Sequence, residues 1–547
     1  MSRKKRSPPA ARDAGDGEAK ALFPWISGWP AAAAVLLFAL ALRAPIAAIP
    51  LERDEGGYAY IAQRWLLGDV PYKTSFDQKT PGIDVVYAAI IRFVGSSASA
   101  IHWGTQVYLL GALVLLFLLG KKMFSGEAGV VAAAVCAPML ADPSVLGNAA
   151  NSEVFMVLPL IGSMLTMIYA VEEGSDAWAL LTGLLLGAAC LFKQVALADA
   201  VLVGAYFVWK SPRRWALLAW AAAGGAAALS ATTAYFAAHH AAREFYDCVL
   251  GHNLSYAARM PLAAYAANAW SGFSPIWSSF WPVYLAAAVG CATGGPLAVL
   301  WLVFSFLGVS ISGYYRGHYF IQIVPAISLL AGAGITKAFS SFRPAARILL
   351  SYACAAALIG YGLHAAAWYY SSAGAVDKGR RIYFDNPFPE SVLVGRYIAE
   401  RSTPNDTVFV FGSEPQIMYY AERRSASRYI YAYPLMAALG ETAARQREAL
   451  AEIAANAPKF IVTAHLPTEF LMSRQTPMDL MTGLGALLSA SYRLVAATPL
   501  KRTGEPELIV GETLEGLWRR NPMWYDKPAW ASLLVWERKP PPGASIQ

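Results

Sequence analysis

The chain has 547 residues, of which 56% are hydrophobic and 15% are charged, and its mean hydropathy is +0.40. Soluble domains contain about 25% charged residues, so this composition excludes an ordinary cytosolic enzyme, and an aromatic content of 13% excludes a disordered chain. The net charge of +8 does not indicate nucleic-acid binding, because much of the Lys and Arg lies in short loops between long apolar segments. Such segments indicate an integral membrane protein.

The chain begins with a polar tail, residues 1–26, which carries basic residues at positions 3–6 and is predicted to be a cytoplasmic anchor. The first apolar run, 29–50, could be a signal peptide, but its length and the many runs after it favour an uncleaved span. Further spans are expected near 103–119, 128–142, 154–171, 177–192, 195–209, 215–237, 276–292, 296–312, 319–336 and 345–370. We therefore expect an α-helical polytopic membrane protein with about eleven spans of roughly 20 residues each, in a transmembrane domain over 27–370.

The charges of the short loops predict the orientation of these spans. With the N-terminus inside, the inner loops hold three basic clusters, which are Lys121 with Lys122, Lys210 with Arg213 and Arg214, and Lys337 with Arg343 and Arg347. Basic residues are expected in cytoplasmic loops, so the three clusters agree with this orientation. An odd number of spans then places the C-terminal region, 371–547, outside the membrane.

The C-terminal region is predicted to be a soluble α/β domain. Residues 406–412 and 459–463 have the composition of buried strands, and helical patterns cover 390–402 and 441–456. Alternating helix and strand signals are typical of a small α/β domain. We find no GxGxxG motif or phosphate-binding loop in it, so we assign it no catalytic role.

The first outer loop, 51–102, holds the most informative residues. Asp54 and Glu55 follow the first span directly, and apolar residues then recur at helical spacing, which predicts an amphipathic helix over 56–67 in the membrane interface. A second interfacial helix is expected over 81–94. Two such helices that hold a pair of carboxylates beside the bilayer suit a substrate carried by a lipid.

Five segments in order resemble the GT-C superfamily of membrane glycosyltransferases. They are Asp54-Glu55, the Lys-Thr-Pro-Gly segment 79–82, the Asn-Ala-Ala-Asn-Ser-Glu segment 148–153, Phe-Lys-Gln at 192–194, and the segment 317–325 that opens the tenth span. The resemblance covers about residues 25–370. Within this superfamily the chain resembles the branch that contains the dolichyl-phosphate-mannose protein mannosyltransferases and the bacterial transferase that adds aminoarabinose to lipid A. The chain is thus similar to glycosyltransferase family 39. That branch often has an acid directly before the lysine and two prolines after it, whereas here Gln78 precedes Lys79, Asp77 lies one position earlier, and Thr80 replaces one proline.

The resemblance implies transfer of a sugar from a polyprenyl-phosphate donor to an acceptor hydroxyl group on a glycolipid, a polysaccharide or a protein. The reaction is expected at the outer face of a bacterial plasma membrane, with inversion at the anomeric carbon from a single displacement. The phosphate leaving group is stable as an anion, so the reaction needs one base for the acceptor proton and cations for the phosphate. Asp54 is the candidate base, and Glu55 is expected to orient the acceptor or the donor sugar.

Further side chains are assigned to the same site by this resemblance. Lys79 and Lys193 are candidate phosphate partners, and Arg316 and His318 are candidate donors from the opposite side of the cavity. Asp77, Gln78, Asn151, Glu153 and Gln194 are expected to line the cavity. The bland alternatives are solvated loop charges for the acids, snorkelling for the lysines, a packed histidine at 318, and a pairing of Lys193 with Asp199.

No obligatory metal or other cofactor is expected, although Asp54, Glu55 and Asp77 offer hard oxygen ligands for a divalent cation. Two other classes of protein compete with the enzyme. A transporter or flippase for a lipid-linked or sugar substrate would favour internal repeats and polar groups deep in several spans, whereas the polar groups here gather at one face. A structural membrane subunit that presents the C-terminal domain would leave the charged first loop unexplained.

Overall fold

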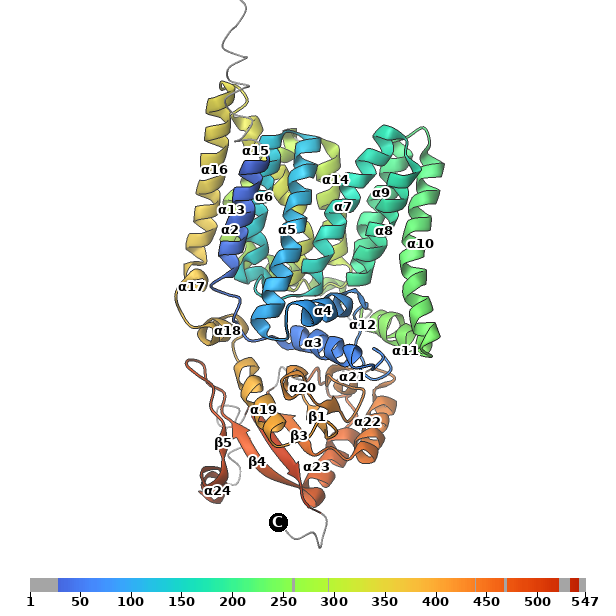
Figure 1. Cartoon of the computed structure of the whole chain (residues 1–547), viewed down its shortest axis with the longest axis vertical. Helices are drawn as coiled ribbons and strands as arrows, with labels where there is room; N and C mark the ends of the chain where they lie inside the picture. Colours follow the sequence, from blue (N-terminus) through green and yellow to red (C-terminus); the bar gives the residue numbers. More distant parts are fainter. Residues whose placement is uncertain are drawn as a thin grey trace, which may run out of the picture.

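The structure is a computed structural model that describes residues 28–257, 261–293, 295–437, 439–466, 470–520 and 532–540. The predicted cytoplasmic tail, 1–26, lies outside the described residues. Figure 1 shows a bundle of long helices and a C-terminal domain with a β-sheet, stacked along the longest axis of the molecule, with short helices between them.

Each predicted span corresponds to a helix of the bundle. These helices are α2 (Trp29–Arg43), α5 (Ala98–Met123), α6 (Gly126–Ala141), α7 (Ser152–Glu173), α8 (Asp176–Phe192), α9 (Leu197–Lys210), α10 (Arg214–Ala238), α13 (Leu262–Thr293), α14 (Pro296–Ser310), α15 (Val324–Ala338) and α16 (Pro344–Ala365). Six described helices are long and apolar enough to cross a membrane, namely α5, α7, α10, α13, α16 and the stretch Gly317–Ala338. The others are shorter, so the number of spans stays a prediction. Helix α7 is mostly buried, while α10, α13 and α16 expose most of their apolar residues, as helices that face lipid do.

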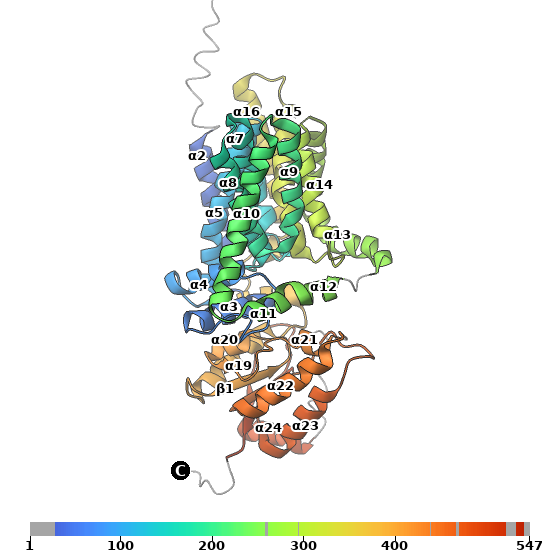
Figure 2. The same ribbon diagram turned by 90° about the vertical axis from the view of Figure 1, so that its right-hand side faces the viewer.

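The loops of the bundle separate by charge between its two ends. The predicted inner loops after α5, α9 and α15 lie at the end away from the sheet (Figures 1 and 2). There Lys122 pairs with Glu172 at 2.5 Å and Arg213 pairs with Asp176 at 3.0 Å, which ties neighbouring loops together. The basic clusters and the C-terminal domain therefore lie at opposite ends of the bundle, as the predicted topology requires.

The two helices predicted in the first outer loop are confirmed as α3 (Arg53–Leu66) and α4 (Gly82–Phe93), which lie across the end of the bundle (Figure 1). We expected α3 to keep a solvated face, but residues 55–62 are all buried between the bundle and the C-terminal domain. Two glycines allow this packing, since a Cβ at Gly56 would fall 2.4 Å from the Cβ of Gln416 and one at Gly57 would fall 1.6 Å from Tyr431 Oη.

Further short elements connect the bundle to this layer. They are the 3-10 helices η1 (Pro143–Val145), η2 (Gln194–Ala196) and η4 (Gly317–Ile323), α11 (Ala242–Tyr246), the π-helical turn η3 (Asp247–Gly251), α12 (His252–Ala257), α17 (Ala367–Tyr370) and α18 (Ala375–Tyr383). Helices α11 and α12 lie between α10 and α13 in sequence and at the same level as α3 in the structure (Figure 2). Segments far apart in sequence thus meet at one end of the bundle.

The C-terminal domain contains a six-stranded mixed sheet with the order β2-β1-β3-β6-β4-β5. The strands are β1 (Thr407–Phe411), β2 (Arg424–Ser425), β3 (Phe460–Ala464), β4 (Tyr492–Thr498), β5 (Ile509–Val510) and β6 (Leu533–Arg538), and the helices are α19 (Phe388–Glu400), α20 (Gln416–Ala421), α21 (Tyr433–Met436), α22 (Thr442–Asn456), α23 (Asp479–Ser491) and α24 (Gly511–Arg520). Strand β1 is parallel to β2 and β3, while β6 runs antiparallel between β3 and β4. The two predicted strands are confirmed as β1 and β3, and the two predicted helices as α19 and α22.

Candidate active site

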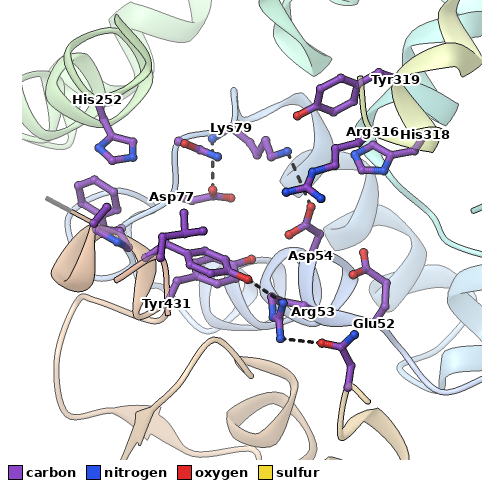
Figure 3. A pocket seen from close by; sticks show the side chains of 17 residues that line it. Glu52, Arg53, Asp54, Asp77, Lys79, His252, Arg316, His318, Tyr319 and Tyr431 are labelled. Atoms are coloured by element: carbon purple, nitrogen blue, oxygen red, sulfur yellow. Dashed lines mark hydrogen bonds and ion pairs between the residues drawn. The ribbon is translucent and has the colours of Figure 1, made fainter. Parts of the chain in front are cut away.

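A cavity of about 520 Å³ lies between the helix bundle and the C-terminal domain. Its lining comes from the start of α3, the loop before α4, α12, the segment that leads into η4, and the C-terminal domain (Figure 3). The polar and aromatic side chains that line the cavity from these segments include Glu52, Asp54, Asp77, Gln78, Lys79, His252, Arg316, His318, Tyr319, Tyr431 and Tyr433. We call this space the polar cavity.

Asp54 reaches the polar cavity because α3 begins there. Glu52 caps the helix, with its side chain accepting from the Glu55 N–H while the Glu55 side chain accepts from the Glu52 N–H. Asp54 lies in the first turn, and its Oδ2 atom is 3.9 Å from Lys79 Nζ. Its side chain stays 31% exposed. The candidate base therefore stands beside a candidate phosphate partner and is accessible from the cavity.

Glu55 points away from the polar cavity into the bundle. Its Oε1 atom accepts from His102 Nε2 at 2.9 Å and from the Ala150 N–H at 2.7 Å, and its side chain is fully buried. This placement corrects the expectation that Glu55 orients a substrate, because its carboxylate already binds three protein groups from α3, α5 and the loop before α7. Glu55 instead anchors α3 on the bundle.

The loop before α4 brings Lys79 and Asp77 into the polar cavity. The Tyr72 hydroxyl donates to the Lys79 carbonyl at 2.8 Å, and the Lys79 N–H donates to Asp77 Oδ1 at 3.2 Å. Burial disfavours the charged form of Lys79, but the negative charges of Asp54, Glu153 and Asp77 raise the pKa of its ammonium group above the usual value. Lys79 is therefore a firmly charged cation.

Asp77 is a buried acid in the same loop. Its side chain is buried, and its Oδ2 atom has no hydrogen-bond partner among the described residues. Burial raises the pKa of Asp77 to about 6, although the charge and the backbone N–H of Lys79 oppose the shift. Asp77 is therefore a buried acid of the cavity wall, with one oxygen that no described residue binds.

The opposite wall holds the remaining predicted cations. The side chain of Arg316 is exposed and has no ion-pair partner in the described part of the chain. His318 lies 3.8 Å from Glu153 through Nε2, and Glu153 also forms an ion pair with Lys193. Lys193 in turn lies 3.5 Å from the centre of the Tyr319 ring. Lys193 is thus already neutralised by Glu153, whereas Arg316 is unpaired.

Asp199 is not the partner of Lys193. Its two carboxyl oxygens accept from Ser305 Oγ and from Gln322 Nε2, each at 2.8 Å. These bonds tie α9 to α14 and η4 inside the bundle. The alternative that Lys193 pairs with Asp199 is therefore wrong, because Asp199 binds Ser305 and Gln322 while Lys193 pairs with Glu153.

A second, mostly apolar groove of about 260 Å³ adjoins the polar cavity. Gln78, Lys79 and Tyr319 line both spaces. The groove is also lined by Glu153, Lys193, Gln194, Val195, Val249, Leu250, Asn253, Leu254, Val309, Ile311 and Gln322. It leads from the cations along apolar residues of η2, η3, α12 and the end of α14, so a molecule with a charged head and an apolar tail fits the two spaces together.

Three further residues were predicted to line the cavity, and the structure gives each a different setting. The Gln78 carbonyl accepts from Asn253 at 2.7 Å, and Gln194 donates to the Val249 carbonyl at 3.3 Å, so both hold the loop that carries α12. Asn151 caps α7, is buried, and makes no side-chain hydrogen bond within the described residues. It does not line either space.

Sequence reasoning missed the contribution of the C-terminal domain. Arg53 donates to the Ser413 carbonyl and to Tyr433 Oη, both at 2.6 Å, and to Glu414 at 2.7 Å. Figure 3 shows Arg53 and Tyr431 on the cavity wall next to Asp54. The domain therefore closes one side of the cavity. The sequence feature that could have indicated this contact is Arg53, the arginine directly before Asp54.

The described residues contain no group of three or more His, Cys, Asp or Glu side chains that could hold a metal ion. Glu52, Asp54 and Asp77 all line the polar cavity but do not converge on one point.

Comparisons with known proteins come from sequence and from structure. Residues 78–236 match the family of dolichyl-phosphate-mannose-protein mannosyltransferases, while no curated protein sequence matches the chain. ArnT from Cupriavidus metallidurans bound to undecaprenyl phosphate is 14% identical, with a TM-score of 0.59 over 94% of this chain and 98% of that one. Its apo state gives 14% identity and a TM-score of 0.55 over 87% and 96%. The archaeal oligosaccharyltransferase AglB from Archaeoglobus fulgidus, in complex with an inhibitory peptide and a dolichol-phosphate, gives 11% and 0.48 over 93% and 88%. The chain thus resembles GT-C glycosyltransferases in the sequence of residues 78–236 and has the fold of ArnT.

Proposed function

We propose that the chain is a membrane glycosyltransferase that moves a sugar from a polyprenyl-phosphate donor to an acceptor hydroxyl group. One observation carries the proposal, which is that the polar cavity with Asp54 and Lys79 adjoins an apolar groove and shares Gln78, Lys79 and Tyr319 with it as lining residues. A polyprenyl-phosphate sugar has the matching sequence of parts, with a sugar, a charged phosphate and a long apolar chain.

The donor phosphate is assigned to Lys79 and Arg316. Lys79 stands where the cavity and the groove meet, and Arg316 lines the cavity with no competing ion pair in the described residues. Lys193 lines the groove but shares its charge with Glu153, so it is a second contact. The prenyl chain then follows the apolar groove. ArnT, which has the same fold, is bound to undecaprenyl phosphate, and this supports a polyprenyl-phosphate donor.

The proposed reaction is a single displacement at the anomeric carbon. The carboxylate of Asp54 takes the proton of the acceptor hydroxyl group, whose oxygen forms the new bond to the sugar. The bond from the sugar to the phosphate oxygen breaks, and polyprenyl phosphate leaves with its negative charge held by Lys79 and Arg316. The configuration at the anomeric carbon inverts. The proposal assigns this electrostatic work to the two cations and includes no metal ion.

The location of the cavity favours an enzyme over a transporter. Transporter sites lie near the middle of the membrane spans, between repeated halves of the molecule. The polar cavity instead lies at one end of the bundle, and the C-terminal domain covers it (Figure 1). The basic loops at the other end assign the cavity to the outer face of a bacterial plasma membrane in this proposal.

The test is mass spectrometry of the glycans and glycolipids of cells with and without the protein. Asp54→Asn is expected to lower the product about 10²- to 10⁴-fold, the usual contribution of a general base, while expression and binding of undecaprenyl phosphate persist. Asp69→Asn is the matched control, because Asp69 follows α3 at its far end and pairs with Arg64 and Arg424 away from the cavity. Unchanged product in Asp54→Asn contradicts the proposed base.

A further inference from the structure

Glu52, a residue that the sequence motifs did not single out, lies beside Asp54 in the polar cavity. Its side chain is 8% exposed and lines the cavity. Its carboxyl group accepts from the Glu55 N–H through Oε1 at 3.3 Å and also from the backbone N–H of Asp54, and it faces the cavity beyond these two bonds. Figure 3 shows the carboxyl groups of Glu52 and Asp54 pointing into the same space.

Capping of α3 alone does not explain a glutamate at this position. Ser, Thr, Asp and Asn are the preferred caps at a helix N-terminus, and their shorter side chains reach the N–H groups of the first turn more directly. Glu52 is also costly to keep. Burial, together with the negative charges of Asp54 and Glu55, raises the pKa of its carboxyl group well above the usual value. A buried acid next to other acids in a cavity is typical of a functional site.

The position of Glu52 indicates what it contacts. Lys79 and Arg316, which hold the donor phosphate in the proposed function, lie on the membrane side of the cavity, and Asp54 lies between them and Glu52 (Figure 3). On the far side of Glu52 the wall is closed by Arg53 and the C-terminal domain. In the proposed function, this part of the cavity, past Asp54, is the space left for a sugar attached to that phosphate.

We propose that Glu52 binds the transferred sugar, with its cavity-facing carboxyl group in a hydrogen bond to a sugar hydroxyl group. This inference rests on the proposed function and names the group that holds the sugar in place at Asp54. A carboxyl group can accept a hydrogen bond when ionised and donate one when protonated, so it suits a hydroxyl group in either state. Glu52 would thus help to set which sugar is accepted.

The test separates the cap from the cavity contact. Glu52→Asn replaces a poor cap by a preferred one and removes the carboxyl group that reaches into the cavity. We expect the thermal unfolding midpoint and the binding of undecaprenyl phosphate to stay close to the wild-type values, while product in cells falls at least about tenfold, the cost of losing one buried hydrogen bond to a carboxyl group. Glu52→Gln keeps the length of the side chain and is expected to give an intermediate amount of product.

Ser97→Asn is the matched control. Ser97 caps α5 at an exposed site, with Oγ accepting from the Ala100 N–H at 3.1 Å, so this variant changes a helix cap away from the cavity. It is expected to keep full product. Wild-type product in Glu52→Asn overturns the role of Glu52 in sugar binding and leaves it as a cap. A wild-type protein that binds no undecaprenyl phosphate and makes no product overturns the proposed function itself, and this inference with it.

Discussion

The acidic residues at the start of α3 differ in what surrounds their carboxyl groups. On the side that faces the bundle, Glu55 is fully buried and accepts hydrogen bonds from His102, from the Ala150 N–H and from the N-terminus of its own helix. On the side that faces the cavity, Glu52 accepts only from N–H groups of the first turn and lines the cavity with the rest of its carboxyl group. Asp54 also lines the cavity, and its Oδ2 atom lies 3.9 Å from Lys79 Nζ. The start of this helix thus carries one acid that is held entirely by protein groups and two acids that face the cavity.

The difference shows how to separate framework from site in this molecule. A buried carboxylate whose oxygens are all bound holds elements together, whereas one with a free oxygen toward a cavity keeps it for a ligand. Asp199 and Asp77 repeat the contrast. Asp199 is satisfied by Ser305 and Gln322 within the bundle, and Asp77 leaves Oδ2 without a partner on the cavity wall.

The largest effect that tests this comparison is expected at Glu55. Glu55→Ala leaves His102 Nε2 and the Ala150 N–H buried without their acceptor, so we expect a loss of about 3–5 kcal/mol of stability and poor expression. Asp54→Asn, at a side chain that is 31% exposed, is expected to change stability by less than about 1 kcal/mol while it lowers the product about 10²- to 10⁴-fold. Thermal unfolding of both purified variants in detergent measures the difference. Equal stability of the two variants would contradict the distinction between anchor and site.

The same contrast explains which site residues the sequence could reveal. Asp54 and Lys79, two charges predicted from the motif to act together at the edge of the bundle, do lie side by side. Helix α3 begins at Arg53, three residues before the predicted start of the helix at 56. In this helix Glu55 faces the bundle, and Glu52, which the motif did not single out, lines the cavity instead.

The fold was predictable where the signal is local. Long apolar runs predicted the bundle helices, and the short apolar segments at β1 and β3 predicted strands. Strands β4 and β6 were not predicted, because they carry charged residues such as Arg493 and Glu537 and pair with each other across more than thirty residues. The packing of the C-terminal domain on α3 depends on Gly56 and Gly57, which no periodicity indicates.

The next expected effect concerns the pH dependence of stability at Asp77. Its pKa is about 6 in the folded protein against 3.8 in an unfolded chain, so the folded state holds this proton more tightly. Stability therefore falls as the pH rises from about 4 to about 6, and the penalty, up to about 3 kcal/mol, remains at pH 7. Asp77→Asn removes this contribution. We expect the variant to unfold at a higher temperature than the wild type at pH 7 and at about the same temperature at pH 4. An equal gain at both pH values would mean that Asp77 is not the acid that titrates in this range.

The smallest effect tests whether close packing of α3 on the C-terminal domain shapes the cavity. A Cβ at Gly57 would fall 1.6 Å from the hydroxyl oxygen of Tyr431, a rigid side chain on the cavity wall, so Gly57→Ala must displace either the ring or the helix. We expect a loss of about 1–3 kcal/mol of stability together with reduced product per folded molecule. Gly485→Ala is the control, because nothing lies within 4 Å of a Cβ at that position in α23, and the change is expected to be neutral or stabilising by up to about 1 kcal/mol. Since Gly57 lies one turn from Asp54 and contacts no substrate in the proposed site, lost product in a variant that still folds would show that the C-terminal domain holds the cavity in its working shape. Full product from Gly57→Ala would instead mean that the reaction does not depend on the exact position of the C-terminal domain on α3.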